Sequence, residues 1–301
     1  MKTFSRLINR NIKLFFKDKG LFFTSLITPL ILLVLYSTFL GNVYRDSFML
    51  SIPEFLNIDE NIIDGCVGGQ LMSSLLAVSC ITVAFCSNML MVQDKVNGAY
   101  NDIAVTPVKH SHVALSYYIA TFSVTLIFNL IALSACLIYT AFMGWYLTVA
   151  DVLLLVFDIF LMTMFGTAFS SVIGFFMSSQ GQISAIGSIV SSCYGFICGA
   201  YMPISQFSEG LQNVISLLPG TYGTALFRNH AMRGAINALS DAGLPESAVE
   251  EIKNAIDCNI YFFGDKVGIG TMFAIVSVTV AVLVIAYVMI NVTLGGKAKK
   301  A

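Results

Sequence analysis

Residues 66–92 read CVGGQLMSSLLAVSCITVAFCSNMLMV, a stretch without a single charged side chain. The hydrocarbon core of a bilayer is about 30 Å thick, and a helix needs roughly 20 apolar residues to cross it. This stretch is long enough for one crossing. Similar runs recur along the chain, and they predict an all-α integral membrane fold of six transmembrane helices, over about residues 21–41, 66–92, 113–143, 148–176, 183–201 and 267–294.

The overall composition excludes the soluble classes of protein. Of the 301 residues, 57% are hydrophobic and only 11% are charged. Ordinary soluble domains contain about a quarter charged residues, and a soluble chain of this length could not cover its surface with so few. We therefore expect residues 1–301 to form a single transmembrane domain.

Two features divide the longest uncharged runs into separate helices. Gly144, Trp145 and Tyr146 are typical of a turn at the membrane surface, and they separate the third span from the fourth. A polar cluster at residues 178–182 separates the fourth span from the fifth. Six spans would place both termini on the same side.

The basic residues indicate which side that is. Eleven of the 16 Lys and Arg residues lie in the N-terminal segment, in the loop 93–112 and in the C-terminal tail, together with only three acidic residues. Loops rich in Lys and Arg tend to remain in the cytoplasm. We therefore expect a multi-pass protein of the plasma membrane, in a bacterial cell, with both termini cytoplasmic.

The first 19 residues have the pattern of an amphipathic helix. At 100° per residue, four basic side chains share one face, with apolar side chains roughly opposite: Arg6, Arg10, Lys13 and Lys17. Such a helix lies in the headgroup layer and contacts anionic lipid. We expect residues 1–19 to form an interfacial helix on the cytoplasmic surface.

Two long segments are expected on the outer side, residues 42–65 and residues 228–266, the second with a polar helix between Pro245 and Asp257. Cys66 and Cys258 lie near these segments, and they are either two free thiols or one disulfide. The other five cysteines lie in apolar runs and show no metal-ligand spacing, so we expect no metal site.

Sequence motifs for catalysis are missing. The chain has no GxxxxGK[ST] phosphate-binding loop, so it does not hydrolyse ATP alone. It also has no HExxH zinc-protease motif and no GxSxG nucleophile elbow. His110 and His112 form an HxH pair without a carboxylate or cysteine in register. We expect no enzymatic activity, no cofactor bound by this chain and no nucleic-acid partner.

The loop after the second span carries the most specific residues of the sequence. Among them are an acidic-basic pair, a glycine and a Thr-Pro dipeptide: Asp94, Lys95, Gly98, Asn101, Asp102, Thr106 and Pro107. This pattern resembles permeases of the ABC-2 family of ATP-binding-cassette exporters, which carry an acidic-basic pair, Gly-Thr-Leu-Glu and then Thr-Pro at this place. Ala99, Tyr100 and Asn101 stand where that family has Thr-Leu-Glu. The resemblance implies that loop 93–112 contains the short coupling helix that docks on a separate ATPase subunit.

A second match lies on the opposite side. Tyr201 and Pro203 end the fifth span, and Leu218-Pro219-Gly220-Thr221-Tyr222 looks like the family's Asn-Pro-Leu-Thr-Tyr. Each proline removes a helix donor, so two short half-helices are expected in a re-entrant segment over residues 203–227. The resemblance implies that such a segment covers the outer end of the translocation path.

The resemblance as a whole implies the transmembrane subunit of an ATP-driven exporter of lipophilic or amphiphilic substrates, such as drugs, antimicrobials or lipids. ATP and Mg²⁺ would bind to the partner ATPase, and a second permease copy would complete a homodimer or a heterodimer. The alternative is an ion-driven secondary transporter, which binds its substrate near the membrane midplane.

Asp158 allows two interpretations. It lies seven residues after Asp151 on one helical face, about 10 Å deeper in the membrane. A carboxylate there is costly unless it is paired or protonated. Asp158 therefore faces either the substrate path or dimer interface, or it is protonated or hydrogen-bonded to a neighbouring helix.

Overall fold

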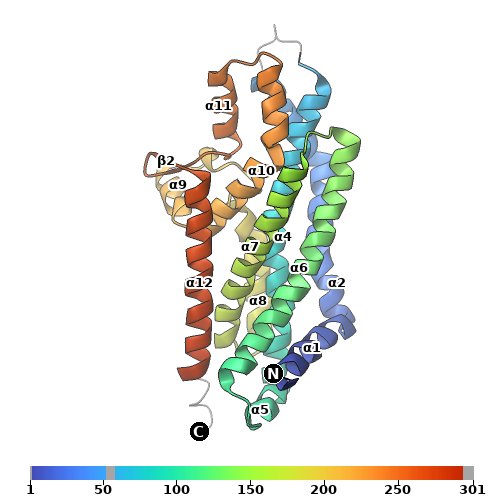
Figure 1. The fold of residues 1–301 in the computed structure, drawn as a ribbon, viewed down its shortest axis with the longest axis vertical. Helices are drawn as coiled ribbons and strands as arrows, with labels where there is room; N and C mark the ends of the chain where they lie inside the picture. Colours follow the sequence, from blue (N-terminus) through green and yellow to red (C-terminus); the bar gives the residue numbers. More distant parts are fainter. Residues whose placement is uncertain (1, 52–57, 294–301) are drawn as a thin grey trace.

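Helix α4 (Glu60–Val96) forms the centre of a long helical bundle in the computed structural model, which describes residues 2–51 and 58–293 (Figure 1). Most of its side chains are buried, and it contacts α2, α6, α7, α8 and α10. Small residues allow these helices to approach closely. A Cβ atom on Gly69 would lie only 2.8 Å from the backbone oxygen of Ala231 in α10. The stretch without charges at residues 66–92 is therefore the most enclosed part of the protein.

Four further helical segments of the bundle are long and apolar enough to cross a membrane. They are α2 (Lys19–Leu35), which continues through the π-helical turn η1 (Tyr36–Leu40) into α3 (Gly41–Ser51), and then α6 (His110–Met143), α7 (Val149–Phe176) and α12 (Ile269–Thr293). With α4 they make five candidate spans among the described residues. The prediction of a helical membrane protein is therefore confirmed, with five candidate spans.

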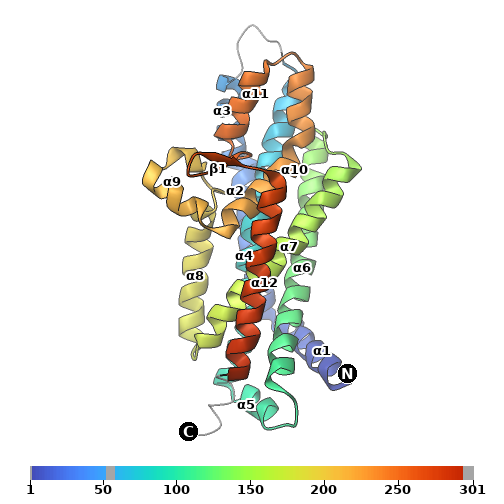
Figure 2. The same cartoon turned by 60° about the vertical axis from the view of Figure 1, so that its left-hand side comes forward.

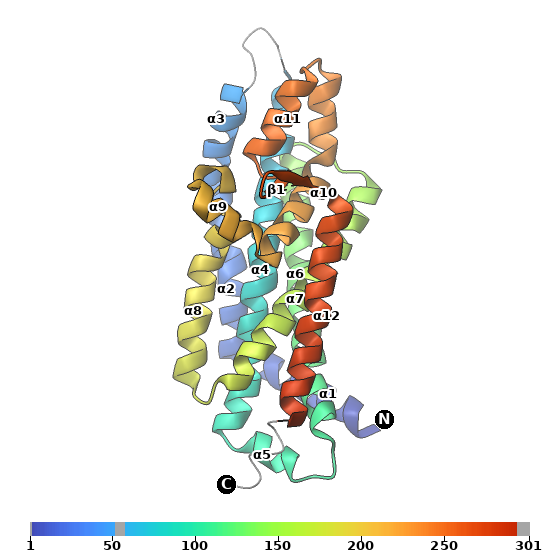
Figure 3. The same cartoon turned by 90° about the vertical axis from the view of Figure 1, so that its left-hand side faces the viewer.

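Helix α8 (Gln180–Ile197) occupies the place of the predicted fifth span. It runs beside the other long helices (Figures 2 and 3), but it is not one of the five candidates. The reason lies in its composition, because Gln180, Gln182 and several serines interrupt its apolar residues. A sixth crossing therefore depends on α8.

The predicted turn between the third and fourth spans lies between α6 and α7. Gly144 follows the last residue of α6, and Thr148 caps α7. The Thr148 backbone N–H donates to Asp151 Oδ2 at 2.9 Å, and the Asp151 N–H donates to Thr148 Oγ1 at 3.3 Å. This reciprocal pair is a capping box, so one of the two aspartates of the predicted fourth span also fixes the start of α7.

Helix α1 (Lys2–Lys17) lies beside the base of α6, at the end of the bundle that also carries α5 (Ala99–Ala104) and the last turn of α12 (Figure 1). Phe15 is buried and its ring meets that of Phe128 edge to face, with the centroids 5.9 Å apart. Asp18 then caps α2 by accepting from the Leu21 N–H. The amphipathic segment is therefore a helix attached to the bundle both by Phe15 and by Arg10, which pairs with Asp94 of α4 at 2.7 Å.

The opposite end of the bundle contains α3, α10 (Pro219–Asp241) and α11 (Glu246–Ala255) (Figure 3). Helix α10 crosses the boundary that we predicted between the re-entrant segment and the external loop at residue 228. The charged side chains near that boundary suggested a solvent-exposed loop, whereas the structure buries Arg228 and His230 inside the bundle. The helix continues because its interior contains no proline.

Three smaller elements lie around α10. The 3-10 turn η2 (Ile204–Gln206) and α9 (Glu209–Ser216) precede it, and an antiparallel hairpin of β1 (Ile260–Phe262) and β2 (Asp265–Val267) joins α11 to α12. The sequence pattern did not predict this hairpin. Cys66 and Cys258 are both free and buried. Of the two alternatives, two free thiols or one disulfide, the structure contains two free thiols.

Candidate functional site

The predicted coupling loop forms the short helix α5, at the end of the bundle opposite α11 (Figure 2). Gly98, with a φ of 82°, lies at the turn between α4 and α5. This left-handed conformation favours glycine, although a Cβ there would touch nothing within 4 Å. After α5, Thr106 Oγ1 donates to the Ile103 carbonyl at 2.6 Å, and Pro107 cannot continue the helix.

One side of α5 packs on the bundle and the other is open. The ring of Tyr100 stacks on that of Tyr117 in α6, with centroids 6.2 Å apart. The outward side carries four of the predicted coupling residues together with Val105, whose exposed fraction is 71%: Asn101, Asp102, Thr106 and Pro107. An exposed apolar side chain surrounded by polar ones is suited to contact another protein.

Asp94 lies behind this exposed side and joins three helices. Its Oδ2 atom accepts from Arg10 Nη1 of α1 at 2.7 Å and from the Tyr117 hydroxyl of α6 at 2.6 Å. The residue is only 6% exposed. Asp94 therefore holds α1, α4 and α6 together, and its carboxylate is not available to a partner protein.

Lys95 plays a similar part toward α7. Its ammonium donates to the carbonyls of Gly174 at 3.1 Å and Phe175 at 2.7 Å. Both carbonyls belong to the last turn of α7, where a cation is favoured, and the Gly174 carbonyl also accepts from the Met177 N–H at 3.2 Å. The acidic-basic pair thus connects the root of α5 to the bundle, while Asn101, Asp102 and residues 105–107 form the exposed surface.

The predicted outer residues hold α9 against the start of α10. Thr221 Oγ1 donates to the Ile215 carbonyl at 2.9 Å, and the Tyr222 hydroxyl donates to the Ser216 carbonyl at 2.5 Å. Pro219 is the first residue of α10, where the missing N–H costs nothing, and Leu218 precedes it on the surface. These residues form one folded corner.

Tyr201 and Pro203 lie at the other end of the same segment. The Tyr201 ring packs against Phe196, with centroids 5.1 Å apart, and its hydroxyl is 3.4 Å from the Ser191 carbonyl of α8. Pro203 precedes η2. The chain between α8 and α9 is therefore attached to the C-terminal part of α8.

Asp158 has a partner inside the same chain. Its Oδ2 atom lies 2.6 Å from His230 Nδ1 of α10, and the carboxylate is completely buried. The His230 ring in turn stacks on Phe273 of α12 at 5.8 Å. The structure therefore has the hydrogen bond to a neighbouring helix, and Asp158 does not lie on the surface of the chain, where a dimer interface would form.

Two more charged pairs involve α10. Arg228 Nη1 lies 3.1 Å from Asp257 Oδ2, and Arg233 Nη2 lies 2.6 Å from Asp151 Oδ1. Arg228 also donates to the Gly199 carbonyl. Burial raises the pKa of Asp257, and the neighbouring Arg228 opposes that rise. We call the contacts of Arg228, His230 and Arg233 with their aspartates the α10 pairs.

Our sequence reasoning missed the α10 pairs, although a signal was present. Asp151 and Asp158 are two turns apart on one face of α7, and His230 and Arg233 are three residues apart on one face of α10. Complementary charges with helical spacing on two segments predict that the two helices pack together.

Comparison with known proteins agrees with this architecture. The model of the ABC-2 type transporter family matches residues 2–231, from α1 into α10. No curated protein and no solved structure matches the chain. The family match covers well over half of the 301 residues. The chain therefore belongs to the ABC-2 type transporter family.

Proposed function

We propose that this chain is the transmembrane subunit of an ATP-driven exporter whose ATPase is a separate polypeptide. Membership of the ABC-2 family makes the chain a membrane permease component. The sequence has no phosphate-binding loop, so ATP and Mg²⁺ would bind to the partner. The observation that carries the proposal is the exposed surface of α5 and the residues after it, which offers Val105 and Pro107 together with three polar side chains at one end of the bundle.

The topology that we propose has six crossings, with α8 as the fifth. Both termini then share the side of α5, in agreement with the concentration of Lys and Arg in these segments. The side that carries α5 is the cytoplasmic side of a bacterial plasma membrane. Two permease copies, identical or different, would form the complete transporter with their ATPases.

The contacts at the root of α5 suggest how movement is transmitted. Asp94 connects α4 to α1 and α6, and Lys95 connects α4 to α7. A displacement of α5 by the ATPase therefore acts on four helices together, as rigid-body rocking requires. Substrates would be lipophilic or amphiphilic molecules leaving the cytoplasm or the inner leaflet.

The alternative, an ion-driven carrier, has one observation in its favour. The α10 pairs place titratable groups inside the bundle, and Asp158 with His230 is completely enclosed. Each of these aspartates, however, already has a basic partner. Export that responds to a proton gradient and not to ATP would favour this alternative.

The coupling proposal is tested with Val105→Asp in cells that also produce the ATPase. A charge in the middle of the exposed α5 surface should lower co-purification of the ATPase by about ten-fold or more, the effect of one desolvated charge at an interface. Membrane insertion and thermal stability should not change, because Val105 is 71% exposed.

The matched control is Val149→Asp, at an equally exposed valine in the first turn of α7, where an acidic residue suits the helix N-terminus. That variant should retain the ATPase. Normal ATPase binding and export by Val105→Asp would contradict the proposal.

A further inference from the structure

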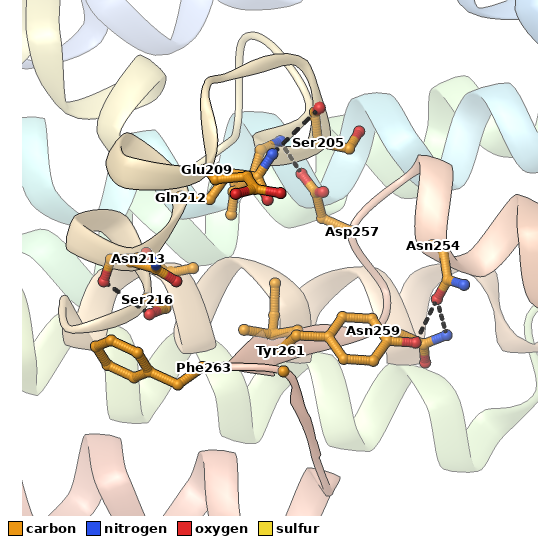
Figure 4. Close-up of a pocket in the computed structure, with 14 residues that line it drawn as sticks. Ser205, Glu209, Gln212, Asn213, Ser216, Asn254, Asp257, Asn259, Tyr261 and Phe263 are labelled. Carbon is orange, nitrogen blue, oxygen red and sulfur yellow. Dashed lines mark hydrogen bonds between the residues drawn. The ribbon is translucent and has the colours of Figure 1, made fainter.

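A polar pocket of about 450 Å³ lies between α9, the end of α11 and the β-hairpin (Figure 4). Its walls include carboxamides, a carboxylate and two aromatic rings: Glu209, Asn213, Asn254, Asn259, Tyr261 and Phe263. Asn254 Oδ1 accepts from Asn259 Nδ2 at 2.7 Å and from the Tyr261 hydroxyl at 3.1 Å. These hydrogen bonds fix the Tyr261 ring in the wall of the pocket.

An apolar groove of about 390 Å³ lies next to this pocket, among α7, α8, α12 and the start of α10. Its lining exposes only apolar atoms, from residues that include Phe165, Phe169, Ile189, Cys193 and Leu283. Thr221 lies in the walls of both the groove and the pocket. Both volumes fall in the range of about 300–1,000 Å³ that is usual for small-molecule sites.

The two cavities lie at different depths along the bundle. The hairpin directly precedes α12, and α9 and the hairpin lie beyond the outer ends of α8 and α12 (Figures 2 and 3). Tyr261, Phe262 and Phe263 are exposed there, as aromatic residues often are at the headgroup layer. The pocket is therefore at headgroup depth, and the groove beside α8 and α12 is at the depth of the lipid chains.

The charges of the pocket select the sign of its ligand. No Lys, Arg or His of the described segments lines either cavity. Asp257 is already paired with Arg228, whereas the exposed Glu209 carboxylate has no ion-pair partner in the described part of the chain. A cationic group would find a free carboxylate and two aromatic faces, both of which attract cations. An anionic headgroup would find no opposite charge.

We propose that the groove and the pocket form one site for a cationic amphiphile, with its apolar chain in the groove and its ammonium group beside Glu209, Tyr261 and Phe263. The inference rests on the proposed function only for the placement of α8 and α12 in the membrane. It names a ligand class and a location on the outer side, apart from α5.

A native cysteine makes the site measurable. Cys193 lies in the groove and is exposed, whereas Cys86 is half-buried and the other five cysteines are buried. The test follows the rate at which a lipid-soluble aryl diazirine photolabels Cys193 in the full-length chain, in nanodiscs of phosphatidylcholine, by mass spectrometry, because a thiol at the depth of the lipid chains forms little of the thiolate that maleimides require. Dodecyltrimethylammonium should slow the reaction by about five-fold or more, and dodecyl sulfate at the same concentration by less than about two-fold.

The variant Glu209→Gln tests the charge. It should raise the concentration of dodecyltrimethylammonium needed for half-protection by about five-fold. Glu251→Gln is the matched control, because Glu251 is exposed on α11 and does not line the pocket. It should leave half-protection unchanged, and both variants should keep the parent melting temperature.

Two results would overturn the proposal. Equal protection by the two detergents would show simple partitioning into an apolar surface. Efficient cross-linking of two copies through Cys193, with no modification of the thiol in the uncross-linked nanodisc, would show that a second permease covers the groove. Neither result bears on the coupling proposal, because no ATPase is present in the assay.

Discussion

The two ends of the bundle use acidic and basic residues in different ways. At the end that carries α5, Asp94 and Lys95 contact α1, α6 and α7, while Asp102 and its neighbours are exposed. At the opposite end, Arg228 and His230 are buried in contact with Asp257 and Asp158. Asp102 is therefore available to a partner at one end, whereas Arg228 and His230 are enclosed at the other.

This difference suggests different mechanical roles. Exposed groups on a short helix lose little when that helix shifts, because water can replace their partners. Buried pairs cannot separate without leaving a charge unpaired, which is strongly destabilising. The end with α5 is therefore suited to move with an ATPase, and the end with α10 is suited to keep its helices together.

The largest expected effect is that of Arg228→Ala. Arg228 is 1% exposed and its removal leaves the Asp257 carboxylate buried without its cation. We expect a loss of about 3–5 kcal/mol in the free energy of unfolding, measured by thermal or denaturant unfolding of the purified protein in detergent.

The control for Arg228 is Lys266→Ala, which breaks the exposed contact of Lys266 with Glu250. It should cost less than about 1 kcal/mol. Equal losses in the two variants would mean that the α10 end is no more enclosed than the surface, and the comparison would fail.

A smaller effect is expected from Asp94→Ala. The change removes a charge-assisted hydrogen bond with the partly exposed Arg10 and leaves the Tyr117 hydroxyl without its acceptor. We expect a loss of about 1–3 kcal/mol, accompanied by faster backbone hydrogen exchange in α1.

Asp102→Ala sharpens the same test. Asp102 is exposed on α5, so its replacement should leave stability within about 0.5 kcal/mol and weaken only the association with the ATPase. A stability loss in Asp102→Ala as large as that in Asp94→Ala would remove the distinction between the root of α5 and its exposed side.

Much of the architecture was predictable because lipid imposes a simple rule on sequence. Helices that face hydrocarbon must be long and uncharged, and α4, α6, α7 and α12 follow from their apolar runs. The turn at Gly144 followed from residue types that favour membrane surfaces. The loop residues after α4 could be found as a motif, since Gly98 adopts the conformation that glycine favours.

The remaining features depend on contacts between segments distant in the sequence. The sequence pattern placed Arg228 and His230 in an external loop, because it does not show their aspartate partners, which lie 29 and 72 residues away. The loop motif identified Asp94 as a docking residue, because the sequence does not show its contact with Arg10, which lies 84 residues before it. A single sequence shows which residues are charged but not which of them form ion pairs. In this protein, the ion pairs determine whether a charged residue is buried or available to a partner.

Gly98→Ala should have a modest effect that is confined to the end with α5. The φ of 82° costs a non-glycine residue about 1 kcal/mol, while a Cβ would touch nothing. Gly210→Ala in α9 is the control, because it also has open space but lies within a helix, where alanine stabilises. Opposite signs of the two stability changes are expected in unfolding experiments; a stabilised Gly98→Ala variant would show that α5 does not require the left-handed residue.

The smallest expected effect concerns Cys258, between α11 and β1. Burial raises the pKa of its thiol to about 12, so at pH 9 only about one thiol in a thousand is ionised, and the thiolate is the reactive form. Raising the pH from 7 to 9 should therefore leave Cys258 unmodified by maleimide in the folded protein, while the denatured protein reacts at both values. Cys66 is a second free and buried thiol, so comparing the two cysteines distinguishes burial from a property of Cys258 itself as the cause of low reactivity.

Reaction of Cys258 at pH 9, or recovery of a peptide joining Cys66 to Cys258 from oxidised membranes, would mean that the α10 end opens on the time scale of labelling. It would then share the mobility that we assign to the end with α5.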